Sequence, residues 1–246
     1  MNAPESAQLQ LPENASLPTR LRLAVKALGI LKNYPTDTIA GPLLNESIDF
    51  GVYERLLQGL TETPEGRDLL ARRPSLQGPE LDLEALAALP ESSLGFAFAR
   101  YFHDNGIGPF STTNALRNDL DYISKRYRET HDLYHVITGY KTDVAGEMEL
   151  QAFAMGNLGI RTPLLIVPFG TVTLAFMKDK QPKDFSLVRF LGQLRDAYQK
   201  GASSRKFLDF PFEEHWETPL EEVRAMLLAP RTAPAPPAHA SRAPPS

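Results

Sequence analysis

Two histidines placed four residues apart carry the clearest chemical signal in this chain of 246 residues, which contains five histidines in all. They open and close the run HDLYH at 131–135, and Glu147 follows after eleven further residues. Residues four apart share one face of an α-helix, so the His131 and His135 imidazoles can approach one ion. Two histidines with one or two carboxylates, here from Asp132 and Glu147, suit a divalent transition metal.

The chemistry of such a site stays open at this level. The zinc-protease pattern HExxH has glutamate where this chain has Asp132, and the side chain shorter by one methylene argues against a water-activating base there. Phosphohydrolases built on a His-Asp pair need further ligands that have no evident counterpart here. Two histidines and one carboxylate also form the ligand set of non-haem iron oxygenases, so zinc, iron, manganese and magnesium all remain candidates. A hydrogen-bonded core network without metal is the alternative interpretation.

Basic residues precede the first histidine by less than two helical turns: Lys125, Arg126 and Arg128. Arg126 and Arg128 are candidates to bind a substrate carboxylate or phosphate through bidentate hydrogen bonds. Alternatively, they belong to a solvated helix face and pair with Glu129 or Asp121.

A long helix from Ala115 to about Thr138 must position the two histidines. Thr112 or Thr113 is expected to cap its start, and Gly139 to end it. Its apolar stripe continues at the same spacing onto the histidines, which therefore replace hydrophobic residues on the buried face. The stripe consists of Leu116, Leu120, Ile123 and Tyr127.

A second helix must position Glu147. Asp143 is expected to cap it, and a short hairpin would place it beside the first helix. His131, His135 and Glu147 then occupy three corners of a site. Asp132 is either a fourth ligand or the acceptor that orients an imidazole.

The rest of the pattern predicts an all-α fold, because strand-type alternation is rare. We expect a flexible arm at 1–18, one helical domain at 19–228 and a disordered Ala/Pro-rich tail at 229–246. Further helices are predicted at Leu21–Lys32, Leu43–Leu60, Leu81–Leu89, Ser93–Asp104, Leu187–Gly201 and Leu220–Leu228, the last with Thr218 as its cap and Pro219 at its first position.

Two segments allow two interpretations each. Leu21–Lys32 is basic and amphipathic, so it can lie on an anionic membrane surface or simply pack on its own domain. Thr162–Met177 is apolar but interrupted by two prolines and a glycine. It is interpreted either as a buried core segment or as a lipid-facing or tunnel-lining wall.

Composition narrows the class of protein. A hydrophobic content of 42% and a charged content of 23% are typical of a soluble globular protein. The net charge of -4, with no basic cluster, gives no support for nucleic-acid binding. The absence of cysteine excludes disulfides, iron–sulfur clusters and thiol catalysis. The N-terminus is polar and has no apolar signal-peptide core, so we expect a bacterial cytoplasmic protein.

The stretch RYRETHDLYHVITGYKTDVAGEMELQAF at 126–153 resembles the core of the coenzyme Q biosynthesis protein 4 family. The hallmark of that family is His-Asp-x-x-His, eleven residues and Glu, all of which is present. FARYFHDNGIGPF at 98–110 and FEEHWETPLEEVRAML at 212–227 are similar to segments that flank this core in the family. The resemblance covers residues 20–228, apart from a linker at Lys180–Asp184.

This resemblance implies an all-α fold with a divalent metal at His131, Asp132, His135 and Glu147. It implies a homodimer, a hydrophobic groove for a polyprenyl chain, and peripheral association with the inner membrane, where ubiquinone is made. The implied reaction is an oxidative decarboxylation in ubiquinone biosynthesis. In it, a hydroxyl replaces the carboxyl on ring carbon 1 of a polyprenylated 4-hydroxybenzoate precursor.

Three functional hypotheses follow. The first is the metal-dependent decarboxylase, favoured because mixed His/carboxylate sites tend to leave a ligand position open; Arg126 or Arg128 would hold the ring carboxylate. The second is a prenyl-lipid-binding scaffold or carrier that organises other ubiquinone biosynthesis proteins and whose metal is structural. The third is a hydrolase of prenyl phosphates, suggested by the basic residues beside the site.

Overall fold

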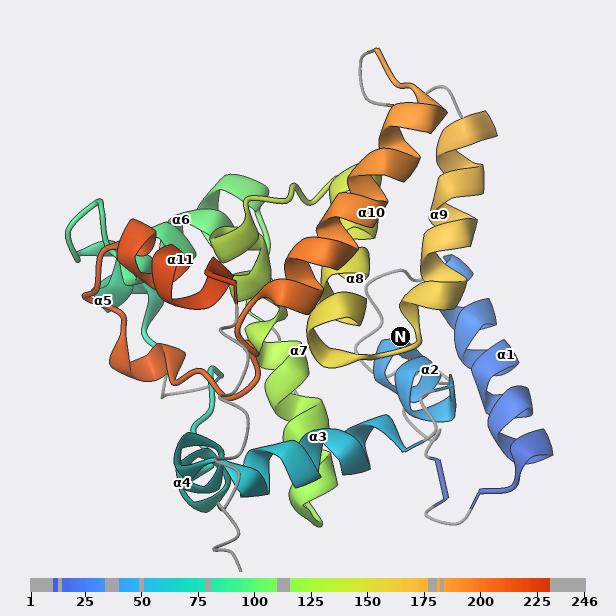
Figure 1. Ribbon diagram of the computed structural model, residues 1–246, viewed down its shortest axis with the longest axis horizontal. Coiled ribbons are helices and arrows are strands. Elements are labelled where there is room, and N and C mark those ends of the chain that lie inside the picture. The colour runs from blue at the N-terminus through green and yellow to red at the C-terminus, as the bar shows by residue number, and fades with distance from the viewer. Residues whose placement is uncertain are drawn as a thin grey trace, which may run out of the picture.

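The computed structural model describes residues 11–12, 15–33, 40–48, 51–77, 81–109, 116–176, 181 and 184–230 (Figure 1). The predicted all-α fold is confirmed, since these residues form helices and contain no strand. Most of the predicted arm and nearly all of the predicted tail lie outside the described residues. The helices are α1 (Leu17–Asn33), α2 (Ala40–Ile48), α3 (Val52–Glu62), α4 (Pro64–Arg72), α5 (Leu83–Ala87), α6 (Leu94–Asn105), α7 (Asp119–Thr138), α8 (Val144–Leu158), α9 (Pro163–Phe176), α10 (Leu187–Ser203), the 3-10 helix η4 (Phe212–Glu214) and α11 (Leu220–Leu228).

The main core is built around α7 and α8. Helix α8 packs along α10 and against α9, while α3, α6 and α11 pack on α7 (Figure 1). Fully buried aromatic residues from several of these elements fill the space between them, among them Phe98, Tyr122, Tyr134, Phe153 and Phe207. The helix that carries the two histidines is therefore enclosed by packed neighbours on most sides.

Two glycines allow α8 and α10 to approach closely. A Cβ atom at Gly156 of α8 would clash with the Tyr198 carbonyl of α10. A Cβ atom at Gly201 of α10 would clash in turn with the Phe153 carbonyl of α8. Backbone atoms of the two helices therefore face each other at both positions. This close contact limits the position of α8 and of Glu147 on it.

Capping residues set the helix ends around the predicted site. Asp143 accepts a hydrogen bond from the Gly146 amide at 2.8 Å, as expected for the start of α8. Gly139 ends α7 in the left-handed conformation, with φ of 78°. Ser93 caps α6 by accepting from the Phe96 amide at 3.2 Å. These predicted boundaries are confirmed.

The predicted start of α7 is wrong. The helix begins at Asp119 rather than Ala115, because Asn118 caps it through the Asp121 amide at 2.9 Å. The Asp121 carboxylate also accepts from the Arg117 amide at 2.9 Å, which holds the preceding chain outside the helix. Thr112 and Thr113, the expected caps, lie outside the described residues.

Two further boundaries differ from expectation. The helix predicted at Leu43–Leu60 is broken into α2 and α3, since Gly51 adopts a left-handed conformation with φ of 68° between them. Helix α11 has Pro219, not Thr218, at its N-cap position, and no side chain caps it. The unpredicted α4 begins at Pro64 and is capped by Thr63, which accepts from the Gly66 amide at 3.1 Å.

Helices α1 and α2 form a second, smaller hydrophobic cluster of their own, made of Leu23, Ala24, Ala27, Ala40, Leu43 and Leu44. A polar contact links this pair to α7, where the Ser124 hydroxyl donates to Glu46 at 3.2 Å. Burial raises the pKa of the Glu46 carboxyl, although Arg128 and Ser124 act in the opposite direction. The α1–α2 pair is thus a separate layer, joined to the rest partly through buried polar groups.

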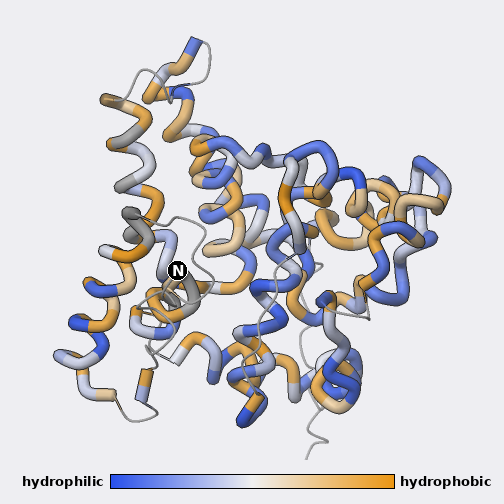
Figure 2. The backbone as a smooth tube through the Cα atoms, turned by 180° about the vertical axis from the view of Figure 1, so that it is seen from behind, coloured by the Kyte–Doolittle hydropathy of each residue, from blue (hydrophilic) through white to orange (hydrophobic). Residues whose placement is uncertain are grey.

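The predicted apolar face of α1 is divided between core and solvent. Ala24 is buried, but Leu21, Leu28 and Val25 are exposed, Val25 at 71%. Figure 2 shows apolar and polar residues alternating along this helix.

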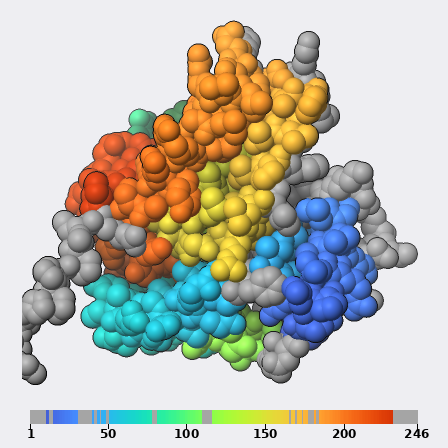
Figure 3. All heavy atoms as spheres, turned by 45° about the vertical axis from the view of Figure 1, so that its right-hand side comes forward, coloured from blue at the N-terminus to red at the C-terminus, as the bar shows by residue number. Residues whose placement is uncertain are grey.

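Helix α9 contains no charged residue; it buries Leu174 and exposes Phe176 at 82%. Figure 3 shows α1, α9 and α10 on the same face of the molecule. No helix of the described residues is long and apolar enough to cross a membrane.

Candidate metal site

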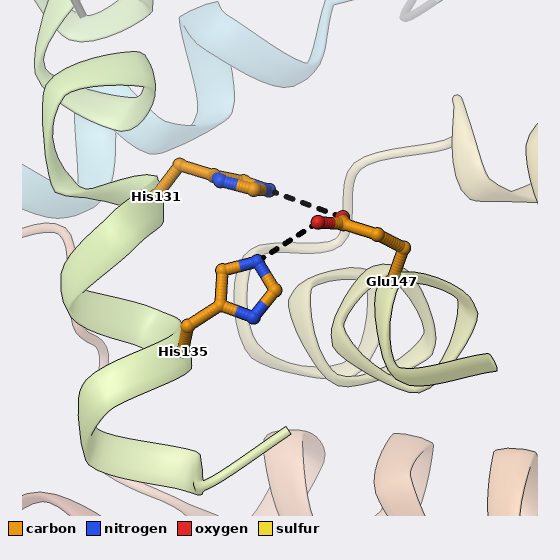
Figure 4. Close-up of side chains that lie close together, drawn as sticks. All are labelled: His131, His135 and Glu147. Carbon is orange, nitrogen blue, oxygen red and sulfur yellow. Dashed lines mark ion pairs between the residues drawn. The ribbon is translucent and has the colours of Figure 1, made fainter. Parts of the chain in front are cut away.

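Three of the four predicted ligands converge between α7 and α8. His131, His135 and Glu147 each offer one ligand atom, and these atoms lie within 4.8 Å of one another. Figure 4 shows both imidazoles projecting from one helix toward the carboxylate of the other. His135 Nε2 lies 3.1 Å from Glu147 Oε1, and His131 Nε2 lies 3.9 Å from Glu147 Oε2. The residues of the described chain that could hold a metal ion are therefore those that the sequence pattern singled out.

The orientation of His135 is determined by the turn that follows α7. Its Nδ1 lies 2.9 Å from the Tyr140 carbonyl oxygen, an acceptor, so Nδ1 carries the proton and donates it. Nε2 faces Glu147 Oε1 at 3.1 Å. The side chain is 1% exposed, and this buried Nε2 makes no hydrogen bond. A metal cation held between the imidazole and the carboxylate would satisfy both groups.

His131 and Asp132 complete the polar surroundings. Asp132 Oδ1 lies 3.8 Å from His131 Nδ1, on the side of the ring away from Glu147. Burial lowers the pKa of His131, but Asp132 and Glu147 outweigh it and raise that pKa above its usual value. Asp132 does not belong to the group of three ligand atoms. Of the two roles considered for Asp132, the geometry favours the acceptor that orients an imidazole.

The site is open on one side. The side chains of His131 and Glu147 are 29% and 33% exposed, whereas His135 is fully enclosed. Mixed His/carboxylate sites of this kind leave a coordination position for water or substrate. Next to His135 lies an open pocket of about 360 Å³, lined by Tyr101, Asn105 and residues 139–143. This pocket borders His135, whereas His131 and Glu147 do not line it.

Tyr101 of α6 is a site residue that the sequence analysis missed. Its ring stacks on the His135 imidazole, with centroids 5.6 Å apart and planes at 21°. Its hydroxyl donates to Asp132 Oδ1 at 3.3 Å. Burial and the neighbouring carboxylates of Asp132 and Glu147 raise the pKa of Tyr101, so the phenol stays a donor. No spacing rule links α6 to α7, although Tyr101 falls within the stretch 98–110 that resembles the family.

The two arginines named as candidate substrate ligands lie in different surroundings. Arg126 is fully buried, and its guanidinium donates to Glu213 and to the Phe210 carbonyl oxygen, the latter at 3.0 Å. Arg126 is five residues from His131, so it projects about 140° away around the helix. Arg128 lies one turn before His131; burial lowers its pKa, and the charge of Glu46 acts against this. By helical spacing Arg128 lies about 60° around the helix from His131, closer to its direction than Arg126.

Residues 10–230 match the profile of the family described as "Coenzyme Q (ubiquinone) biosynthesis protein Coq4". The chain belongs to the Coq4 family. It is 30% identical over 200 residues to "Ubiquinone biosynthesis protein COQ4 homolog, mitochondrial" of Danio rerio, covering 79% of this chain and 70% of that protein. The rat protein of the same name is 30% identical over 234 residues, with 92% and 84% covered. The coq4 protein of Talaromyces stipitatus is 31% identical over 217 residues, with 85% and 72% covered.

A crystal structure of a putative ubiquinone biosynthesis protein from Nostoc punctiforme has the same fold. It superimposes with a TM-score of 0.68 at 24% sequence identity, covering 85% of this chain and 96% of that one. The Coq4 family acts in ubiquinone biosynthesis, and its motif residues His131, His135 and Glu147 form the group that could hold a metal here. The resemblance to this family is therefore confirmed.

Proposed function

We propose that this Coq4-family protein catalyses the metal-dependent oxidative decarboxylation of a polyprenylated 4-hydroxybenzoate precursor. The carboxyl on ring carbon 1 leaves as CO₂ and a hydroxyl takes its place. This is a two-electron oxidation of the ring, for which we propose dioxygen as the oxidant. Water then supplies the hydroxyl oxygen, and dioxygen takes up the two electrons and two protons and leaves as hydrogen peroxide. The observation that carries the proposal is the convergence of His131, His135 and Glu147, in which the buried Nε2 of His135 makes no hydrogen bond and lies 3.1 Å from the Glu147 carboxylate.

His131, His135 and Glu147 would hold the ion, and Asp132 would orient His131. A divalent metal supplies Lewis acidity there, and a redox-active one such as iron supplies electron transfer as well. The Tyr140 carbonyl keeps the proton of His135 on Nδ1 and so leaves Nε2 free to bind. Exposure of His131 and Glu147 leaves room for the substrate ring. We propose that Arg128, which lies one turn before His131, binds the ring carboxylate, rather than Arg126, whose guanidinium is paired with Glu213.

We also propose that the protein works at a membrane surface, where a polyprenyl substrate resides. The support is the exposed stripe of α1, in which Leu17, Leu21, Val25 and Leu28 follow one another at helical spacing. The exposed cations Arg22 and Lys26 flank this stripe, and α1 contains no acidic residue. Basic amphipathic helices of this kind bind anionic bilayers through both features. A position on the cytoplasmic side of a bacterial inner membrane stays a prediction, as do the homodimer and contacts with other ubiquinone biosynthesis proteins.

The second candidate function is a prenyl-lipid-binding scaffold with a structural metal. The exposed apolar faces of α1 and α9 favour it, because they offer lipid contact without any chemistry. The two functions differ in what the histidine pair does. In a scaffold, removal of a metal ligand should unfold the protein, whereas in an enzyme it should remove turnover and leave the fold.

The experiment is lipid mass spectrometry on cells that lack this protein and are complemented with wild type, His135→Ala or His103→Ala. His103 lies on α6 with its side chain 88% exposed, so it is the matched control. We expect wild type and His103→Ala to restore ubiquinone. His135→Ala should accumulate a prenylated precursor that still carries its ring carboxyl, with the purified variant folded by circular dichroism.

Other outcomes would redirect the proposal. If ubiquinone is lost without accumulation of that precursor, and the His135→Ala protein is unfolded, the scaffold hypothesis is supported and the decarboxylase hypothesis is rejected. Normal ubiquinone in the cells that lack the protein would refute a role in the pathway.

A further inference from the structure

We propose that Tyr101 is a positioning residue of the metal site, where it holds both histidine ligands in place from α6. The inference rests on the proposed metal site and extends it to a residue outside the His-Asp-x-x-His…Glu motif. Tyr101 brings a third helix, besides α7 and α8, into contact with the site.

The first contact of Tyr101 acts on His135. The phenol ring lies against the imidazole in a stacked arrangement, with planes inclined by 21°. The Tyr140 carbonyl constrains the same imidazole at Nδ1, but a single hydrogen bond still permits the ring to tilt. The stacked phenol removes this freedom. Nε2 is therefore held toward Glu147 by two independent contacts.

The second contact of Tyr101 acts on His131 through Asp132. The phenol hydroxyl donates to Asp132 Oδ1, which is also the oxygen that lies 3.8 Å from His131 Nδ1. Fixing this oxygen holds the carboxylate beside Nδ1, on the side of the ring opposite Nε2, which lies 3.9 Å from Glu147 Oε2. A carboxylate behind a metal-binding histidine is a common orienting device, and here Tyr101 would orient the carboxylate.

The position of Tyr101 is itself rigid. Its neighbour Phe102 is buried and packs edge-on against its ring, with centroids 5.5 Å apart. One turn earlier, Phe98 stacks on Trp216 at 5.5 Å. The start of α6 is bound to the C-terminal segment, since the Gly95 amide donates to the Trp216 carbonyl at 2.9 Å. A side chain on such an anchored helix can impose its geometry on the site rather than follow it.

The test is cobalt binding to the purified full-length protein, because the visible spectrum of bound Co²⁺ reports its coordination without any need for turnover. Wild type is compared with Tyr101→Phe, which keeps the stack and loses the hydroxyl, and with Tyr101→Leu, which loses both. Tyr198→Phe is the matched control, since it removes a tyrosine hydroxyl from an exposed side chain of α10, 43% accessible, that has no role in the site. Urea unfolding of the metal-free proteins shows whether each variant is folded.

We expect Tyr101→Phe to weaken cobalt affinity about tenfold and Tyr101→Leu up to about a hundredfold, with altered spectra. Tyr198→Phe should match wild type. Because the hydroxyl acts through Asp132, adding Tyr101→Phe to Asp132→Asn should cost little beyond Asp132→Asn alone.

Two results would overturn the inference in distinguishable ways. If wild type binds cobalt and both Tyr101 variants bind it with the same affinity and spectrum, Tyr101 does not position the site. If wild type binds no cobalt, and His135→Ala behaves as wild type does, the proposed metal site itself fails and the role of Tyr101 fails with it.

Discussion

At the scale of single residues, α7 carries two buried polar side chains, His135 and Arg126, that have different surroundings. His135 is buried with a nitrogen that no hydrogen bond satisfies, which is a poor arrangement for stability and a good one for a ligand. Arg126 is equally buried, and its terminal nitrogens donate to Glu213 and to the Phe210 carbonyl, while its Nε makes no hydrogen bond. Burial alone therefore does not mark a functional residue. His135 differs because it lies beside a second histidine and a carboxylate that could share an ion with it.

Arg126→Met should destabilise the protein without changing metal affinity. Removing the guanidinium leaves Glu213 without its partner and the Phe210 carbonyl without a donor. We expect a loss of about 3 kcal/mol, near the low end for a broken buried pair because the Glu213 side chain is 21% exposed. Urea denaturation measures this loss.

The matched control is Arg117→Met, which breaks the Arg117–Asp121 pair near the start of α7. The Arg117 side chain is 49% exposed, so this loss should stay below about 1 kcal/mol. If the Arg126→Met protein is as stable as wild type but binds substrate more weakly, Arg126 is a substrate ligand instead.

At the scale of elements, the distance between α8 and α10 determines where Glu147 stands relative to the histidines. Gly156 and Gly201 face backbone atoms of the opposite helix, so neither position has room for a methyl group. The capping of α8 by Asp143 fixes the residue at which the helix begins, but it does not fix the distance of the helix from α10. The contact at Gly156 and Gly201 fixes that distance.

Gly201→Ala should destabilise the protein by about 1–3 kcal/mol, because the added methyl group forces α10 away from the Phe153 carbonyl. Gly192→Ala on the same helix is the control, since a Cβ atom there meets nothing within 4 Å. That substitution should stabilise by about 0.5–1 kcal/mol through helix propensity. Chemical denaturation of both variants decides the matter; equal effects would show that α8 and α10 are not tightly apposed.

At the scale of the whole molecule, the site and the apolar surface belong to different layers. The histidines lie on α7 within the main core, whereas the exposed apolar stripe belongs to α1, whose core is separate. Figure 3 shows α1 on the same face as α9, whose exposed residues include Leu164, Val172 and Phe176. Both helices therefore carry exposed apolar side chains, although they lie far apart in the sequence.

Val25→Glu should weaken binding to anionic phospholipid vesicles about tenfold or more. The substitution removes a side chain whose burial in lipid contributes about 1.5 kcal/mol, and it adds a charge that the surface repels by about 1 kcal/mol. Co-sedimentation with phosphatidylglycerol vesicles measures the effect. Ile107→Glu is the control, because Ile107 is an exposed apolar residue, at 46%, outside α1 and α9. If both variants bind the vesicles equally well, α1 does not contact the membrane.

The sequence by itself determined the parts of this protein that depend on neighbours a few residues away. Helix periodicity placed His131 and His135 on one face, and short-range hydrogen bonds made Asp143 and Gly139 recognisable as helix ends. The motif of the Coq4 family was recognisable for the same reason, since its ligands recur at fixed spacing within one helical hairpin.

Only the tertiary structure decided which residues from distant elements meet. Tyr101 reaches His135 because α6 packs on α7, and Arg126 is paired because η4 brings Glu213 to it. The apolar face expected for α1 is split because α2 covers Ala24 and leaves Val25 in solvent. These outcomes depend on the rotation of each helix about its own axis. The packing of side chains between helices fixes that rotation, and no spacing within a single helix contains it.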